Sequence, residues 1–287
     1  MQPRFATSVD GHRLAYYEFG SGAPLVLSTG IGVDHAGLWP QIEYFARSRR
    51  VIAWDYRGVG RSRPVADGAD VSIAAHARDL RAVLDAAEVE TADLFGWSMG
   101  VPVTLELVRH APALARSLTL CCAPAGGLLD QRVGVPGVDA IASRVLARTA
   151  HLLHRPLGGA LRLAERSRLL VPVATRVGMI APDIDLDRWR QQVQSVADSD
   201  LHAYLRTMGA LTTVDTTPAL SQIAVPTLVI AAERDRVVTL RAMQQFAAAI
   251  DGAELFVVPG ASHYCVIEQS AEINAKIAAL IGDLEPA

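Results

Sequence analysis

The stretch from Ala92 to Pro102, with the sequence ADLFGWSMGVP, passes from a short apolar run through Gly96-x-Ser98-x-Gly100 into a second apolar pattern. The run before Gly96 predicts a strand, and the apolar residues after Gly100 recur at helical spacing. Glycines on both sides of Ser98 let the chain turn sharply, and Pro102 suits the first turn of a helix. By itself the motif is only a tight turn, but between a strand and a helix it predicts an exposed, reactive serine hydroxyl.

Composition excludes several classes of protein. The chain has 287 residues, of which 51% are hydrophobic and 20% charged, so it fits one large α/β domain or two small ones and can bury a substantial core. A net charge of -3 offers no basic stripe, and we expect no nucleic-acid partner. No apolar run reaches the roughly 20 residues of a membrane span, and no signal-peptide core follows Met1. We therefore expect no membrane partner and a cytoplasmic location, and no sequence feature indicates an oligomeric state.

The three cysteines are too few for a disulfide framework and indicate a reducing compartment. Cys121 and Cys122 end an apolar pattern, so we expect them to pack in the core. His151 and His154 are spaced for one helix face but have no third ligand nearby, which favours a surface feature. The sequence therefore predicts no metal and no cofactor.

The rest of the chain alternates between strand and helix patterns. Arg4–Ser8 and Arg13–Phe19, joined by Asp10-Gly11, predict an antiparallel hairpin at a sheet edge. We expect further strands at Leu25–Ser28, Val51–Trp54, Ser117–Cys122, Val225–Ala232 and Glu254–Val258, and helices at Ser72–Ala87 and Ala271–Ile281. This order predicts an α/β fold with a mostly parallel central sheet flanked by helices.

The alternation stops between residues 125 and 215, where we expect several helices and no strand. We interpret this segment as a helical lid inserted into a core domain formed by residues 1–124 and 216–287. Its many apolar residues exceed what its own helices need, so some should line a substrate pocket together with Gly30, Trp97 and Met179. The alternative is that they pack only against each other or against a second subunit.

Three polar residues follow predicted strands, at the edge where open α/β sheets place their ligand sites: Ser98, Asp235 and His263. A neutral serine needs a base, and an imidazole base needs an acceptor on its other nitrogen. His263 is favoured among the eight histidines because it lies in a loop just beyond a strand. Glu233 is a second candidate for the acid, which we rank below Asp235.

The sequence resembles the α/β-hydrolase fold family over nearly the whole chain except the insertion. The resemblance is carried by the Thr29-Gly30 loop, Asp55-x-Arg57-Gly58-x-Gly60-x-Ser62, Gly96-x-Ser98-x-Gly100, Pro226-Thr-Leu-Val-Ile with Asp235, and Gly260-x-x-His263. It implies Ser98 as nucleophile, His263 as base and Asp235 as the orienting acid. It also implies an oxyanion hole formed by the backbone N–H groups of Ile31 and Met99, and a lid over the active site.

Two positions depart from the family pattern. The first loop begins Thr29-Gly30 where His-Gly is usual, and Val101 replaces a common glycine after the serine. Because oxyanion donors are backbone groups, neither change removes the chemistry. The serine itself excludes the dehalogenase and epoxide hydrolase branches, which use aspartate.

The expected activity is hydrolysis of an ester or lactone bond of a small, largely apolar substrate through an acyl-serine intermediate. The segment Gly32–Trp39, GVDHAGLW, is similar to that of enol-lactonases. Two alternatives stay open: hydrolysis of a C–C bond, and a small-molecule receptor that keeps the triad without turnover.

Overall fold

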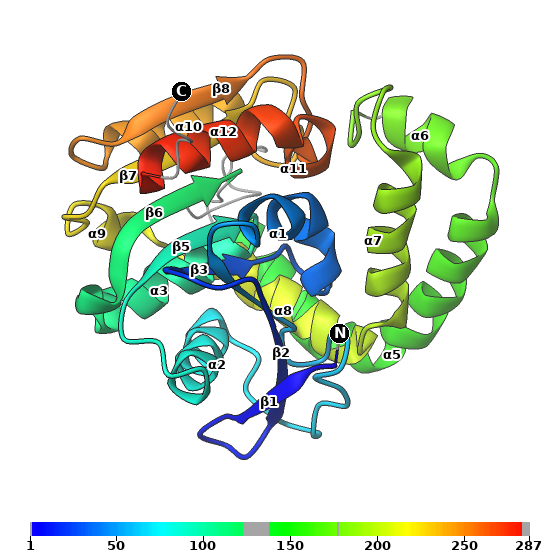
Figure 1. Ribbon diagram of the computed structural model, residues 1–287. Coiled ribbons are helices and arrows are strands. Elements are labelled where there is room, and N and C mark those ends of the chain that lie inside the picture. Colours follow the sequence, from blue (N-terminus) through cyan, green and yellow to red (C-terminus); the bar gives the residue numbers. More distant parts are fainter. Residues whose placement is uncertain (1, 123–137, 177, 283–287) are drawn as a thin grey trace.

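The computed structural model describes residues 2–122, 138–176 and 178–282, which form an eight-stranded sheet with helices on both faces (Figure 1). The strand order is β1-β2-β4-β3-β5-β6-β7-β8. The strands are β1 (Arg4–Thr7), β2 (Arg13–Phe19), β3 (Pro24–Ser28), β4 (Arg50–Trp54), β5 (Ala92–Trp97), β6 (Ala115–Cys121), β7 (Thr227–Ala232) and β8 (Glu254–Val258). The pairs β1–β2 and β2–β4 are antiparallel and the five other pairs are parallel, so the predicted fold class, with its antiparallel edge, is confirmed.

Alternating strand residues divide the core into two layers, one on each face of the sheet. On one face Val26, Leu94 and Val229 pack against the helices α2 (Ile73–Ala86), α3 (Gly100–His110) and α10 (Leu240–Ala248). On the other face Phe95 and Ile230 pack against α1 (Trp39–Phe45), α11 (Cys265–Glu268) and α12 (Ser270–Ile281). Because both faces are covered, the carboxyl ends of the parallel strands are the place where loops can build a site.

The described part of the segment between β6 and β7 is helical, as expected. It contains α5 (Val138–Arg166), α6 (Leu170–Arg176), α7 (Leu186–Asp198) and α8 (Leu201–Thr213), and the short helix α9 (Thr217–Leu220) precedes β7. In Figure 1, α5 and α7 stand beside the sheet, and α8 runs back toward its centre. Residues 125–137 of the expected insertion lie outside the described residues, and the domain boundaries stay a prediction. Within the described part, no helix combines the length and apolar character needed to cross a membrane.

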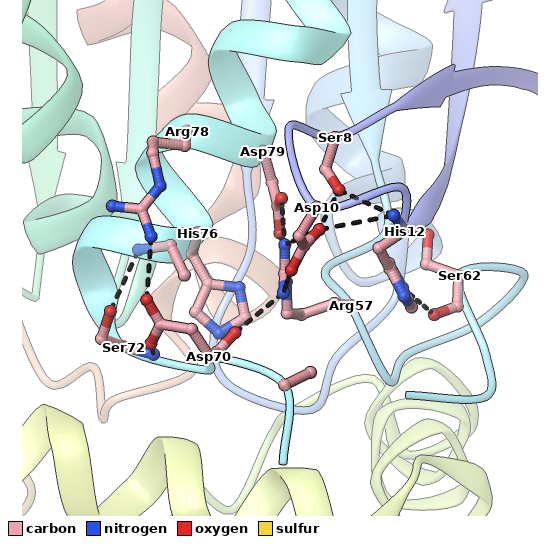
Figure 2. Close-up of polar contacts among 12 residues, drawn as sticks. Ser8, Asp10, His12, Arg57, Ser62, Asp70, Ser72, His76, Arg78 and Asp79 are labelled. Carbon is pink, nitrogen blue, oxygen red and sulfur yellow. Dashed lines mark hydrogen bonds and ion pairs between the residues drawn. The ribbon is translucent and has the colours of Figure 1, made fainter. Parts of the chain in front are cut away.

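A buried arginine fixes the loop that follows β4. Figure 2 shows Arg57 between Asp79 of α2 and Asp10 of the first hairpin, with nitrogen–oxygen distances of 2.6 Å from Nε to Asp79 and 2.8 Å from Nη1 to Asp10. These two carboxylates hold the pKa of Arg57 above its ordinary value despite burial, which acts in the opposite direction, so the guanidinium stays charged. Because the charge of Arg57 is paired inside the protein, this loop joins the first hairpin and α2.

Candidate active site

Ser98 occupies a strained turn between β5 and α3. Its φ angle is +53°, in the left-handed region that non-glycine residues rarely adopt. A Cβ at Gly96 would lie 2.6 Å from the backbone of Gly100, and one at Gly100 would overlap the backbone oxygen of Ser28. The N–H of Ser98 donates to the backbone oxygen of Cys121 at 2.9 Å. Both glycines are therefore required sterically, as the sequence analysis argued.

The structure brings Ser98, His263 and Asp235 into one hydrogen-bonded row. His263 Nε2 lies 2.9 Å from Ser98 Oγ, and His263 Nδ1 lies 2.7 Å from Asp235 Oδ2. All three residues are at least 91% buried, with exposed fractions of 9% for Ser98, 7% for His263 and 6% for Asp235. With Nδ1–H donating to the carboxylate, Nε2 is left as the acceptor for the serine proton.

Asp235 is held in place by the carboxylate oxygen that does not contact His263. Oδ1 accepts backbone N–H bonds from Val237 at 2.6 Å and from Val238 at 2.9 Å. The oxygen that remains, Oδ2, points at His263. Glu233, the second candidate for the acid, is exposed and accepts the N–H of Gly260 at 2.7 Å, so it fixes the loop before His263 and does not contact the imidazole.

The loop that carries His263 is tied down from two directions. Trp97, the residue before the serine, donates its indole N–H to the backbone oxygen of His263 at 3.0 Å. Glu268 accepts from the N–H of Ser262 at 2.7 Å and from the N–H of Ala181 in the insertion at 2.8 Å. The sequence analysis missed Glu268 in this role, because a glutamate in a short helix gives no signal of a contact 87 residues away.

The two predicted oxyanion residues lie at the ends of their elements. Met99 follows the serine at the start of α3, and Ile31 lies in the loop after β3. That loop is fixed by Thr29, whose hydroxyl donates to the backbone oxygen of Val33 at 2.7 Å. Of the residues that the structure describes, none accepts a backbone hydrogen bond from the N–H of Ile31 or Met99. Both N–H groups are thus available to a ligand, and their role stays a prediction.

A small cavity of about 10 Å³ adjoins the predicted oxyanion residues, enough for about one water molecule. Its lining includes Ile31, Met99, His76 of α2, and Tyr204 and Thr207 of α8. The ring of Tyr204 lies against Gly32, where a Cβ would approach it to 2.8 Å. A residue of the insertion therefore reaches the loop beside the serine, a contact that the sequence analysis did not identify.

The predicted pocket residues differ in their surroundings. Trp97 is 2% exposed and lies beneath the histidine loop, and a Cβ at Gly30 would be 3.2 Å from its ring. Met179 is 42% exposed in the segment between α6 and α7. The participation of all three in substrate binding stays a prediction.

The segment Gly32–Trp39 is engaged in structural contacts. Asp34 Oδ1 accepts the N–H of Ala36 at 3.1 Å and begins a short 3-10 helix at His35–Leu38. His35 donates its N–H to Asp55 at 3.0 Å and stacks on Tyr17 with ring centroids 3.5 Å apart. Its similarity to enol-lactonases therefore lies in residues that shape the loop next to the serine.

Comparison with known proteins agrees with the observed fold. Residues 23–270 match the family model described as the alpha/beta hydrolase fold. The chain is 30% identical over 250 residues to a 3-oxoadipate enol-lactonase of Acinetobacter baylyi, covering 85% of this chain and 83% of that protein. It is 46% identical to a putative carbamate hydrolase RutD of Azorhizobium caulinodans over 110 residues, only 37% of this chain and 39% of that protein.

Among solved structures, a thermophilic esterase from Thermogutta terrifontis superposes with a TM-score of 0.80 at 23% identity, over 98% of each chain. At that identity the likeness shows the fold. Since the family model covers most of the chain and the strand order, turn and loops agree with it, this chain belongs to the alpha/beta hydrolase fold family.

Proposed function

We propose that the protein is a serine hydrolase that cleaves an ester or lactone bond of a small, largely apolar substrate. The observation that carries the proposal is the row of hydrogen bonds from Ser98 through His263 to Asp235. The relatives are named an enol-lactonase and a putative carbamate hydrolase, and a similar structure is an esterase. Lactones, carbamates and esters share a carbonyl carbon that a serine hydroxyl can attack.

The geometry supports an acyl-serine mechanism. Ser98 Oγ attacks the carbonyl carbon while His263 Nε2, 2.9 Å away, takes the hydroxyl proton. The bond to the leaving oxygen then breaks, and His263 returns the proton to that oxygen. Water repeats the two steps on the acyl-serine and releases the acid. Asp235 holds the imidazole in its tautomer and stabilises the imidazolium that forms twice in this cycle.

The N–H groups of Met99 and Ile31 are proposed to stabilise the negative charge on the carbonyl oxygen. In oxyanion holes of this kind, removal of one preorganised donor costs roughly 2.7–4 kcal/mol of transition-state stabilisation. Two features support this proposal. The loop that contains Ile31 is fixed by the hydroxyl of Thr29, and helix α3, which begins directly after Met99, points the positive end of its dipole toward the site.

The insertion is proposed to act as a lid that sets substrate choice. Its helix α8 places Tyr204 against the loop that contains Ile31, and the cavity between them has room for no more than a water. A substrate whose acyl group extends into this cavity would displace the α8 side chains, so their size would select among acyl groups. Each methylene that is buried contributes about 0.8 kcal/mol, which ranks substrates by length.

The test is labelling with a fluorophosphonate, followed by mass spectrometry, together with a panel of p-nitrophenyl esters and lactones. Wild-type protein should be labelled at Ser98 and should turn over at least one ester or lactone. Ser98→Ala should lose label and roughly 10⁴- to 10⁶-fold in kcat. Label on another residue of active protein would refute the assignment of the nucleophile.

The same panel separates the alternatives. A receptor would be stabilised by ligands without any turnover that depends on Ser98. A C–C bond hydrolase would be labelled at Ser98 but would cleave a vinylogous diketone faster than any ester. Either result would replace the proposed activity.

A further inference from the structure

All three cysteines of the chain meet at one point beneath the active site. Cys121 ends β6, Cys122 follows it, and Cys265 begins α11, more than 140 residues later. The sulfur atoms of Cys121 and Cys122 are each 3.6 Å from that of Cys265, and they are 4.0 Å from each other. All three residues have an exposed fraction of 0%.

The three separations match those of sulfurs that share one soft ion. A metal–sulfur bond of about 2.3 Å with tetrahedral angles places two sulfurs about 3.8 Å apart. The observed values, 3.6 to 4.0 Å, lie on both sides of that distance. Thiolate ligands select soft ions such as Cu(I) and Zn(II), and Cd(II) has the same preference.

We propose that Cys121, Cys122 and Cys265 form a binding site for one soft, thiophilic ion. For a divalent ion the step is M²⁺ + 3 RSH → [M(SR)₃]⁻ + 3 H⁺: three S–H bonds break, three metal–sulfur bonds form, and nothing is oxidised or reduced. Three protein sulfurs leave the fourth tetrahedral position open to a small exogenous ligand. The sequence alone favoured core packing and predicted no metal, because it does not show that residue 265 returns to residues 121 and 122.

The backbone already holds the three side chains in this arrangement. Cys122 has a φ angle of +49°, and its N–H donates to the backbone oxygen of Ile230 at 2.9 Å. The N–H of Cys265 donates to the backbone oxygen of Ser262 at 3.1 Å. Burial raises the pKa of the Cys121 thiol well above its ordinary value, so that thiol is neutral until an ion displaces its proton.

The proposed site adjoins the catalytic row. One ligand atom from each of Cys122, Asp235 and His263 lies within 4.8 Å of the others. An ion held by the three sulfurs would therefore stand close to the acid and the base. The binding proposal itself depends only on the sulfurs and is independent of the proposed hydrolase activity.

The experiment is a titration of reduced, full-length protein with Cd(II), followed by the ultraviolet charge-transfer absorbance of cadmium bound to thiolates. We expect a band that saturates at one ion per chain in the folded protein. The same result is expected for protein refolded in the presence of Cd(II), a procedure that avoids slow entry of the ion into the buried site. Competition with Cu(I) and with Zn(II) then shows which of the three ions the site binds most tightly. Ser98→Ala, which keeps all three sulfurs, should bind like wild type.

Variants separate a thiolate site from three packed thiols. Cys265→Ser nearly keeps the side-chain volume but removes one sulfur ligand. Loss of a hydrogen bond that supports a metal ligand costs roughly 10- to 100-fold in affinity, and we expect loss of the ligand itself to weaken Cd(II) binding by more than that. Cys121→Ser should do the same if Cys265→Ser fails to fold. Ile230→Val trims the same core cluster without touching a sulfur and should bind normally. No band in folded and refolded wild type, or unchanged binding in folded Cys→Ser variants, would overturn the proposal.

Discussion

The substitution Asp235→Asn should switch His263 to the wrong tautomer while leaving the fold intact. Two backbone N–H groups, from Val237 and Val238, point at Oδ1 of Asp235, so that position must keep an oxygen. The amide NH₂ of the asparagine is thereby forced to the Oδ2 position, 2.7 Å from His263 Nδ1. Facing a donor, Nδ1 becomes the acceptor, and the ring proton moves to Nε2.

The expected loss follows from that tautomer. With a proton on Nε2, His263 donates toward Ser98 Oγ and has no lone pair there to accept the serine proton. An asparagine in this position of a serine triad costs about 10⁴-fold in kcat. That factor corresponds to about 5.4 kcal/mol of lost transition-state stabilisation. Stability should change little, because both backbone hydrogen bonds to Oδ1 remain.

The measurement is kcat/KM on a p-nitrophenyl ester near neutral pH, with thermal unfolding as the check on the fold. Glu233→Gln is the matched control, because a glutamine oxygen can still accept the N–H of Gly260 and no bond to His263 is lost. We expect the control to stay within a few-fold of wild type. If Asp235→Asn retained activity and Glu233→Gln lost it, the assignment of the acid would be refuted.

Three further predictions test the surroundings of the site. His76 is buried, and this burial together with the nearby charge of Arg57 lowers its pKa to about 3. The unfolded chain therefore binds a proton at a higher pH than the folded protein does, and the free energy of unfolding falls below about pH 6.5 by roughly 1.4 kcal/mol per pH unit. His76→Phe should remove about 2 kcal/mol of that loss between pH 6.5 and 5 in urea unfolding, and an unchanged pH slope would contradict this. Tyr204→Ala should make longer acyl chains the preferred substrates, with kcat/KM rising about fourfold for each added methylene, while the rate of fluorophosphonate labelling of Ser98 stays unchanged. An unaltered order of substrates would rule out Tyr204 as a pocket wall. Gly100→Ala places a Cβ on the Ser28 backbone oxygen, so in thermal unfolding it should lower the free energy of unfolding by roughly 1–3 kcal/mol, and activity should be lost. The control Gly159→Ala, in open space on α5, should be neutral or stabilising.

The parts of the fold that were predictable are those specified by short-range pattern. β2 and β8 have the predicted bounds, and α2 starts one residue after the predicted start, Ser72, whose hydroxyl caps the helix by accepting the N–H of Ala75 at 3.1 Å. Strand periodicity and caps are local properties, so they can be read without the tertiary structure. The positions of Ser98, Asp235 and His263 followed because parallel strands bring their carboxyl ends to one edge.

What could not be predicted depends on contacts between distant segments. Tyr204 reaches Gly32 across 172 positions, and Cys265 reaches Cys122 across 143. Neither Tyr204 nor Cys265 stands in a motif, because Tyr204 lies within a helix of the insertion and Cys265 starts a one-turn helix after the loop of His263. The packing of the insertion on the sheet is set by apolar surface, which many arrangements of four helices would bury equally well.

Hydrogen bonds to the rest of the fold hold the loops around the candidate site in place before a substrate binds. Ser98 is tied through its N–H to Cys121 of β6, and the loop of His263 is tied through Trp97 of β5 and through Glu268. These are bonds to the sheet and to a helix end, so the distance between serine and imidazole is set by the rigid part of the fold. The bond from Ala181 to Glu268 is different, because it joins the same histidine loop to the insertion. Movement of the insertion during substrate entry would therefore act on the base through Glu268, and Glu268→Gln, which keeps an acceptor oxygen but loses the charge, should lower kcat more than it raises KM.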